Sequence, residues 1–231
     1  MLTTLEILSL DENLLAGTIP SELFLMTSLQ RLELFQNAIT GTIPTEVGQL
    51  SDSLSLFSAN VNFLTGTVPL EHFIKLSDTL VALGLGDNNF EMGSSTIPTE
   101  IGLLSKLTSL HLGGAGFMST IPNEFGNCTS MRRLILHDNF HLTGTIPTTI
   151  ARMTDLELLT LWSNELTGTV PTEFGTLTSL TRLGMAGSNI TGNVNPIFCE
   201  STIISSTIQF LEFDCLGPLP EIICSCCTGC F

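Results

Sequence analysis

A string of about two dozen residues repeats along this chain, and this periodicity limits the fold more than any other feature. Its clearest copy runs from 156 to 175 and reads LELLTLWSNELTGTVPTEFG. Leucines alternate with other residues in its first half, which is typical of a short strand with one buried face. Asn164 follows, and its amide can satisfy backbone groups that a bend leaves unpaired. Gly168 then allows a turn, and Pro171 precedes a short helical turn.

The proline of this string recurs at near-constant intervals, which indicates that the whole unit is copied. Successive intervals are 24, 25, 29, 24, 25, 24 and 25 residues for Pro20, Pro44, Pro69, Pro98, Pro122, Pro147, Pro171 and Pro196. Such a period is typical of solenoids, in which a unit buries its apolar face only against its neighbours. We therefore expect one elongated array, although 231 residues would suffice for two compact domains.

The shared pattern LxxLxLxxNxLxGxIP resembles the plant-type leucine-rich repeat, found in ectodomains of receptor-like kinases and in polygalacturonase-inhibiting proteins. The resemblance covers residues 5–196. It implies an α/β solenoid, which is a right-handed, curved array with a parallel β-sheet on the concave side and short helical turns on the convex side. We assign residues 1–198 to about eight repeats and residues 199–231 to a cysteine-rich C-terminal cap.

The first residues already fit the repeat, and no basic stretch of a secretory signal precedes them. A solenoid needs a cover over its first coil, yet here Leu2, Leu5, Leu8 and Leu10 would face an open end. We therefore expect that an N-terminal cap, and a signal or anchor, are missing from this sequence. A partner chain that covers this end is the alternative.

The strongly acidic composition excludes some classes of binding partner. The net charge is −15, from 22 acidic residues against seven Lys and Arg. Such a surface repels phosphate backbones and anionic lipid headgroups, so we expect neither nucleic acid nor membrane-surface binding. No segment reaches the roughly 18 to 20 apolar residues that span a bilayer.

Six cysteines lie close together at the end of the chain and predict three disulfides that close the last coil. Each would contribute about 2 to 4 kcal/mol, and all fifteen pairings remain open. A metal cluster is the alternative, although adjacent cysteines fit structural zinc poorly. We expect the remaining Cys128 to be a buried thiol. The six are Cys199, Cys215, Cys224, Cys226, Cys227 and Cys230.

The tail pattern DCxGxxPExxCxCCxxC resembles the ending of leucine-rich-repeat proteins from diatoms and related algae. Disulfides imply an oxidising compartment, so we expect an extracellular or cell-surface location. Two glycosylation sequons, at Asn127 and Asn189, are compatible with it. Free thiols and an intracellular scaffold are the alternative.

The residues that flank the strand leucines point away from the core, one row per repeat, and give the candidate binding surface. His111, His137 and Trp162 fall on adjacent rows. Such a group of aromatic residues beside basic residues has the composition of a binding hot spot. The alternative is an ordinary exposed aromatic beside a flat glycine surface. Added residues in the fourth and sixth repeats favour a site, because insertions in solenoids gather on a contact edge. Further candidates are Arg132, Arg133, Ile135, Phe35, Phe90, Met92, Phe140 and His141.

Threonines and glutamates also recur at fixed positions of the repeat, and both have structural explanations. Thr-Gly-Thr recurs in several repeats, and stacked threonines could bind ice, but threonine also suits a short strand. A glutamate two residues after most prolines is expected to open a convex helical turn. The threonine copies begin at Thr40, Thr65, Thr143 and Thr167, and the glutamates are Glu22, Glu46, Glu71, Glu100, Glu124 and Glu173.

No catalytic motif is present: the sequence contains no phosphate-binding glycine loop, no Gly-x-Ser-x-Gly and no His-Glu-x-x-His. We expect no cofactor, no metal and no enzymatic activity. The resemblance implies a non-catalytic recognition module that binds a protein, peptide or glycan on its concave face. Ice binding and an intracellular scaffold are the alternatives.

Overall fold

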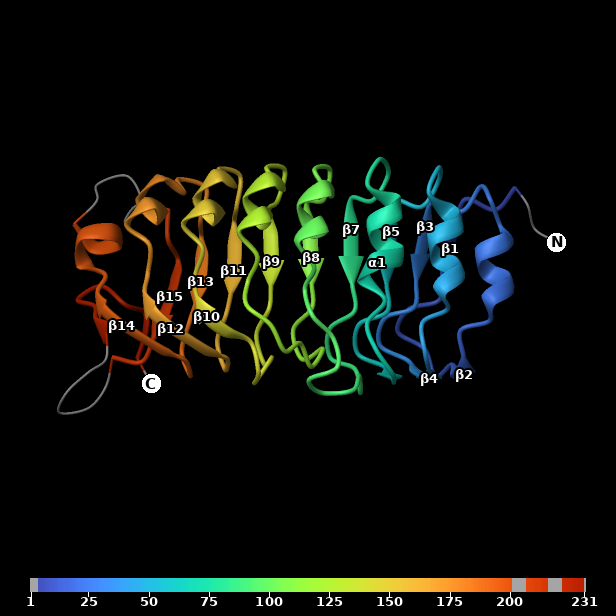
Figure 1. Ribbon diagram of the computed structural model, residues 1–231, viewed down its shortest axis with the longest axis horizontal. Helices are drawn as coiled ribbons and strands as arrows, with labels where there is room; N and C mark the ends of the chain where they lie inside the picture. The colour runs from blue at the N-terminus through green and yellow to red at the C-terminus, as the bar shows by residue number, and fades with distance from the viewer. Residues whose placement is uncertain (1–3, 201–206, 216–221, 231) are drawn as a thin grey trace.

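The computed structural model describes residues 4–200, 207–215 and 222–230. The chain coils into an elongated stack, with short helices side by side along one side and a long sheet behind them (Figure 1). Every strand pair in the stack is parallel, as the repeat pattern predicts. The predicted α/β solenoid is confirmed.

One ten-stranded sheet contains a strand from each repeat in chain order. Its pairing keeps equivalent positions opposite each other, so that Leu159 pairs with Leu134 on one side and with Leu183 on the other. The leucines therefore form one buried row, and the residues between them form the open face, meaning the side turned away from the core. The strands are β1 (Ile7–Ser9), β3 (Arg31–Glu33), β5 (Leu56–Ser58), β7 (Ala82–Gly84), β8 (Ser109–His111), β9 (Arg133–Ile135), β11 (Leu158–Thr160), β13 (Arg182–Gly184), β15 (Phe210–Phe213) and β17 (Gly229–Cys230).

A second set of strands follows the asparagines, but it forms two separate sheets rather than one. The fourth and fifth repeats interrupt it, and there only isolated bridges occur, between Ser95 and Phe117 and between Thr120 and Thr143. The fourth repeat has added residues here, and the fifth has Ala115 in place of the repeat asparagine. One sheet comprises β2 (Ala16–Thr18), β4 (Ala38–Gly41) and β6 (Phe63–Leu64), and the other comprises β10 (Thr143–Thr145), β12 (Glu165–Thr169), β14 (Asn189–Asn193) and β16 (Ile222–Ile223).

Short helices follow the repeat prolines, and most are 3₁₀ helices because a single turn is all that the repeat length allows. The six glutamates expected to open these turns lie in the first turn of their helices. The helices are η1 (Ser21–Leu25), η2 (Thr45–Leu50), α1 (Leu70–Phe73), η3 (Ile74–Leu76), η4 (Thr99–Leu103), η5 (Asn123–Asn127), η6 (Thr148–Arg152), η7 (Thr172–Thr176) and η8 (Asn195–Cys199), the last with π-helical bonding.

The repeat asparagine acts as predicted. Asn139 is fully buried, and its amide nitrogen donates to the carbonyls of Leu112 and Leu136 at 3.0 and 2.9 Å. Its side-chain oxygen accepts a bond from the backbone N–H of Phe117 at 3.0 Å. Asn37, Asn62, Asn88, Asn139 and Asn164 each join neighbouring coils in this way, whereas Asn13 bonds only within its own coil. Leucines and phenylalanines make up most of the core.

Three disulfides are present in the C-terminal region, as predicted, and join Cys199 to Cys226, Cys215 to Cys230 and Cys224 to Cys227. The sulfurs of Cys199, Cys224 and Cys226 lie within 4.8 Å of one another. All three are bonded to another sulfur, so this group holds the chain covalently rather than as a thiolate cluster.

Cys128 is the free cysteine, and it is buried as expected. Its thiol donates to the carbonyl of Ile101 at 3.3 Å. Burial raises the pKa of this thiol to about 11. Among the described residues, no helix has the length and apolar character needed to cross a bilayer.

Candidate functional site

Three rings stand side by side on the open face, and we call His111, His137 and Trp162 the aromatic ladder. His137 and Trp162 are stacked, with ring centroids 4.1 Å apart and planes 4° from parallel. His111 follows at 5.8 Å from His137, tilted by 50°. Their placement on β8 and just after β9 and β11 confirms that these residues occupy adjacent rows.

Glycines beside the aromatic ladder make room for its rings. A Cβ atom on Gly113 would lie 2.7 Å from His137 Cε1, and one on Gly86 would lie 2.5 Å from His111 Nε2. Real Cβ atoms do not approach other atoms so closely, so a larger residue at either position would displace a ring. The glycines are therefore the floor on which the rings lie, and not a flat surface without a role.

His111 has a lowered pKa and, in the described part of the chain, a ring nitrogen without a hydrogen bond. Its Nε2 is buried and has no hydrogen-bond partner among the described residues. The nearest carboxylate oxygen, Oδ2 of Asp87, is 3.6 Å away. Desolvation lowers the pKa of His111, and the charges of His137 and Arg133 lower it further, while Asp87 opposes the shift.

His137 has a polar partner as well as its ring contacts. Its Nδ1 lies 3.1 Å from Oδ2 of Asp138. This contact and the stacking against Trp162 fix the ring from two directions. The ladder is therefore preorganised, since its side chains are held before any ligand arrives.

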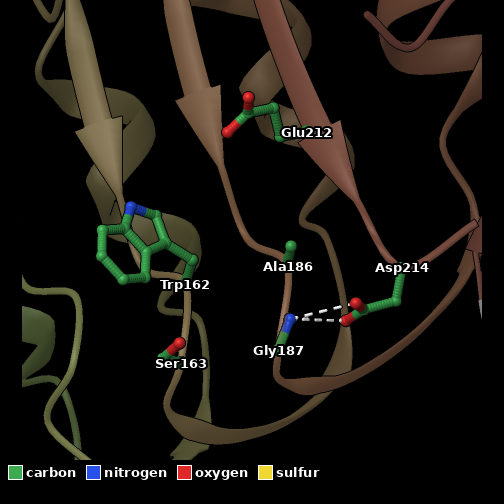
Figure 2. A pocket seen from close by; sticks show the side chains of 6 residues that line it. All are labelled: Trp162, Ser163, Ala186, Gly187, Glu212 and Asp214. Carbon is green, nitrogen blue, oxygen red and sulfur yellow. Dashed lines mark hydrogen bonds between the residues drawn. The ribbon is translucent and has the colours of Figure 1, made fainter. Parts of the chain in front are cut away.

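A cavity of about 330 Å³ opens beside Trp162 on the side away from His137. Figure 2 shows the indole at one side of it and the carboxylates of Glu212 and Asp214 at the other. Asp214 accepts the backbone N–H of Gly187 with both oxygens, at 2.8 and 3.1 Å. Ser163 and Ala186 complete the lining.

Glu212 and Asp214 were not among the candidates from the sequence. The sequence contained a signal, because Glu212 occupies an outward position on the strand pattern at 208–213 and Asp214 directly follows it. That strand is degenerate and lies among the cysteines, so the sequence pattern assigns it to the cap. Its pairing as β15 with β13 makes it a continuation of the open face.

The other candidates on the open face lie at different distances from the ladder. Arg133 and Ile135 belong to β9, and Arg132 directly precedes it, with its Nη1 3.5 Å from Oε1 of Glu157. Both arginines are exposed. Phe35 follows β3, and β5 and β7 separate that strand from β8. Phe35 is therefore not part of the ladder.

The two insertions meet at one edge of the array. Met92 of the fourth repeat and Phe140 and His141 of the sixth repeat line one cavity of about 550 Å³, which we call the edge pocket. Met92 is 72% exposed and Phe140 54%. Phe90 also lines it but is only 5% exposed. Its ring packs within the core, so it borders the pocket with little exposed surface, and a direct ligand contact by Phe90 stays a prediction.

The remaining candidates lie on the surface outside these cavities. Asn127 and Asn189 are both exposed, at the end of η5 and the start of β14. The threonines of β10 and β12 are exposed as well, and Thr145 pairs with Thr167. Thr143, however, pairs with Glu165, so the predicted ladder of threonines is staggered as well as divided between two sheets.

Similarity to known proteins follows the repeat. The Leucine Rich Repeat family model matches residues 28–50 and 155–177. Receptor-like protein 39 and Receptor-like protein 41 of Arabidopsis thaliana are each 36% identical to this chain over 83 residues, which is 36% of the chain and 9% of the relative. The match therefore spans a small part of these longer relatives.

Solved structures resemble almost the whole chain. The ectodomain of the receptor kinase GASSHO1/SCHENGEN3 from Arabidopsis thaliana, in complex with CASPARIAN STRIP INTEGRITY FACTOR 2, is 32% identical, with a TM-score of 0.80 over 91% of this chain and 24% of that one. The plant peptide hormone receptor RGFR1, in complex with RGF2, is 29% identical, with a TM-score of 0.71 over 92% and 36%.

A plant ice-binding protein shares the fold at 24% identity and a TM-score of 0.58, over 94% of this chain and 84% of that one. The repeat pattern, the parallel sheet, and the similarity to these receptors agree. The chain is a leucine-rich-repeat solenoid that is similar to the ectodomains of plant receptors.

Proposed function

We propose that this chain is a non-catalytic recognition module that binds a peptide on its open face, with the aromatic ladder as the anchor. The stacked pair of His137 and Trp162 carries the proposal. A stacked indole and imidazole offer a large contact area whose conformational entropy is already lost, so little more is lost on binding. Arg132 and Arg133, at the margin of the ladder, would contribute charge contacts.

The similar receptors support a peptide rather than another ligand. GASSHO1/SCHENGEN3 and RGFR1 each carry a named factor or peptide hormone partner in their structures. HAESA, which is 29% identical, was solved with the peptide hormone IDA and the co-receptor SERK1. A glycan remains the second ligand class, because sugars also stack on indoles.

We place this recognition outside the cell. Three disulfides hold the C-terminal region, and disulfides persist in oxidising compartments but are rare in the cytosol. They weigh against the intracellular scaffold.

Ice binding has weaker support from the residues of this chain. An ice-binding surface needs a regular array of threonines, and here the array is staggered and interrupted at the fourth and fifth repeats. A thermal hysteresis measurement distinguishes the two functions. We expect no hysteresis from the wild-type protein, and a hysteresis that Thr145→Asp abolishes would favour ice binding instead.

Selection from a random peptide display library on the immobilised protein tests the proposal. We expect selected peptides to bind at micromolar affinity, and Trp162→Ala or His137→Ala to weaken them about tenfold, as for a binding hot spot. Leu103→Ala, at a 59% exposed position on η4, is the control that removes apolar surface elsewhere. Peptides that tolerate both ladder variants, or no selected peptide at all, would contradict the proposal.

A further inference from the structure

We propose that the cavity between Trp162 and Glu212 receives a cationic side chain of the bound peptide, a guanidinium or an ammonium group. This inference rests on the proposed function and specifies what the ligand must carry. It follows from three features of the cavity: its shape, its two carboxylates without a cationic partner, and the free face of the indole.

The cavity has the shape of a socket. Its floor comes from the residues after β13 and is small, with Ala186 and Gly187. An adjoining cavity of about 200 Å³ shares Trp162 and Glu212 with it, and Arg182, Leu183 and Gly184 of β13 line that one. A Cβ atom on Gly184 would lie 3.1 Å from Trp162 Cδ1 and 3.8 Å from Glu212 Oε2. The indole and the carboxylate therefore stand on opposite sides of Gly184, and a side chain that enters from the open face passes between them.

The carboxylates in the socket lack a positive partner. Among the described residues, the carboxylate of Glu212 has neither a hydrogen bond nor an ion pair. Asp214 accepts only backbone N–H groups, from Gly187 and, at 3.4 Å, from Ser188. The arginine on β13, Arg182, places its guanidinium 5.7 Å from the centre of the Phe210 ring. Arg182 lines the adjoining cavity together with Glu212 and Trp162. In the described part of the chain, however, neither Glu212 nor Asp214 forms an ion pair with it or with another cation.

The indole offers its second face to the same cavity. His137, after β9, covers one face, and the socket lies on the β13 side of Trp162. A cation over an indole face is attracted by the ring's quadrupole, and Trp is the best of the aromatic residues for this contact. A guanidinium is planar, so it can stack on the indole and donate to the carboxylate of Glu212 at the same time.

A neutral sugar would also use an indole and carboxylates, but its binding does not depend on charge. This difference separates the two ligands experimentally. Trp162 is the one tryptophan of the sequence, so intrinsic fluorescence reports on this socket without a label. Nα-acetyl-arginine amide is a suitable probe, and Nα-acetyl-citrulline amide has nearly the same shape without the charge.

We expect the arginine compound to change the emission in a saturable way, with a dissociation constant of roughly 1 mM, the range for so small a ligand. The citrulline compound should bind at least about fivefold more weakly, since a charge-assisted contact is lost. Glu212→Gln should weaken the arginine compound to a similar degree. Glu22→Gln removes the same charge from an exposed position on η1 and should leave its affinity unchanged.

Equal binding of the two compounds, or full affinity in Glu212→Gln, would overturn the inference. So would a change of emission with neutral cellotetraose that Glu212→Gln leaves intact, which would identify the socket as a sugar site. Failure here is distinct from failure of the proposed function. Selected peptides that depend on Trp162 but contain neither Lys nor Arg would remove the inference and keep peptide recognition.

Discussion

His137 and Trp162 lie ring to ring, 4.1 Å apart and 4° from parallel, although 25 residues of sequence separate them. The solenoid brings them together because each repeat adds one strand, and equivalent positions then stack at the strand spacing of about 4.8 Å. Side chains on adjacent rows thus form contacts that no single repeat could make. The ladder is a product of the array.

The first prediction concerns the ladder as a binding anchor. Trp162→Ala, His137→Ala or Arg133→Ala should each weaken a selected peptide by more than about 1 kcal/mol, the usual threshold of a hot-spot residue. Calorimetric titration measures the loss, and circular dichroism on heating should show that each variant stays folded. A variant that loses affinity only because it unfolds would not support a role of that residue as a binding anchor.

The second prediction concerns the glycine floor. Gly113→Ala places a methyl group 2.7 Å from His137 and should destabilise the protein by about 1 to 3 kcal/mol, as overpacking does. Gly175→Ala is the matched control, because no atom lies within 4 Å of its added Cβ. In a helical turn that change should be neutral or stabilising by up to about 1 kcal/mol. Urea denaturation compares the two, and equal effects would contradict a role of Gly113 as the floor.

The third prediction concerns pH. Because burial lowers the pKa of His111 below 6.5 in the folded state, protonation favours the unfolded chain. The contribution of neutral His111 to the free energy of unfolding is therefore fully present above pH 6.5. It is lost as the pH falls through the pKa of His111 in the folded state. His111→Gln should therefore lose less stability than the wild type between pH 7.5 and pH 5 in urea denaturation. An NMR titration that gives His111 a pKa at or above 6.5 would refute this.

The fourth prediction concerns the asparagine ladder. Asn139→Ala should cost about 1 to 3 kcal/mol for each buried group left unpaired, and Asn139 is fully buried. Asn13→Ala is the matched control at an exposed position, where water can replace the bonds to Leu10 and Asp11. Similar free energies of unfolding for the two variants would mean that burial is not the cause.

The fifth prediction concerns the cysteines. Alkylation followed by intact-mass measurement should add no label to the native protein and one label in denaturant without reductant. Cys128 is the free thiol, and its burial and its pKa of about 11 both suppress the reactive thiolate. Denaturant with reductant should give seven labels, one for each cysteine. More than one label without reductant would contradict the three disulfides.

The parts of the fold set by local spacing could be predicted from the sequence. The row of Leu159, the buried Asn164 and the turn after Pro171 depend only on the position of a residue within its own repeat. The adjacency of His137 and Trp162 followed from the same register. Their stacking and the glycine floor beneath them could not be foreseen, because they depend on side-chain rotamers across neighbouring coils.

Features that join distant or irregular segments were harder to predict from the sequence. The pairing of six cysteines requires the path of the last coils, and the sequence left every pairing open. The burial of Phe90 depends on how an insertion folds back on the array. Glu212 lies on a degenerate strand, so its place in the socket depends on the pairing of β15 with β13, which the sequence pattern does not determine.

The interruption of the second sheet has a mechanical consequence. In a linear array each coil is held only by its neighbours, so the chain first separates where one of these junctions is weakest. At the fourth and fifth repeats the ten-stranded sheet continues, but only isolated bridges take the place of the second set of strands. We therefore expect the stack to separate first at this junction under load or heat. The edge pocket lies across it, so a molecule bound there would clamp the two halves together.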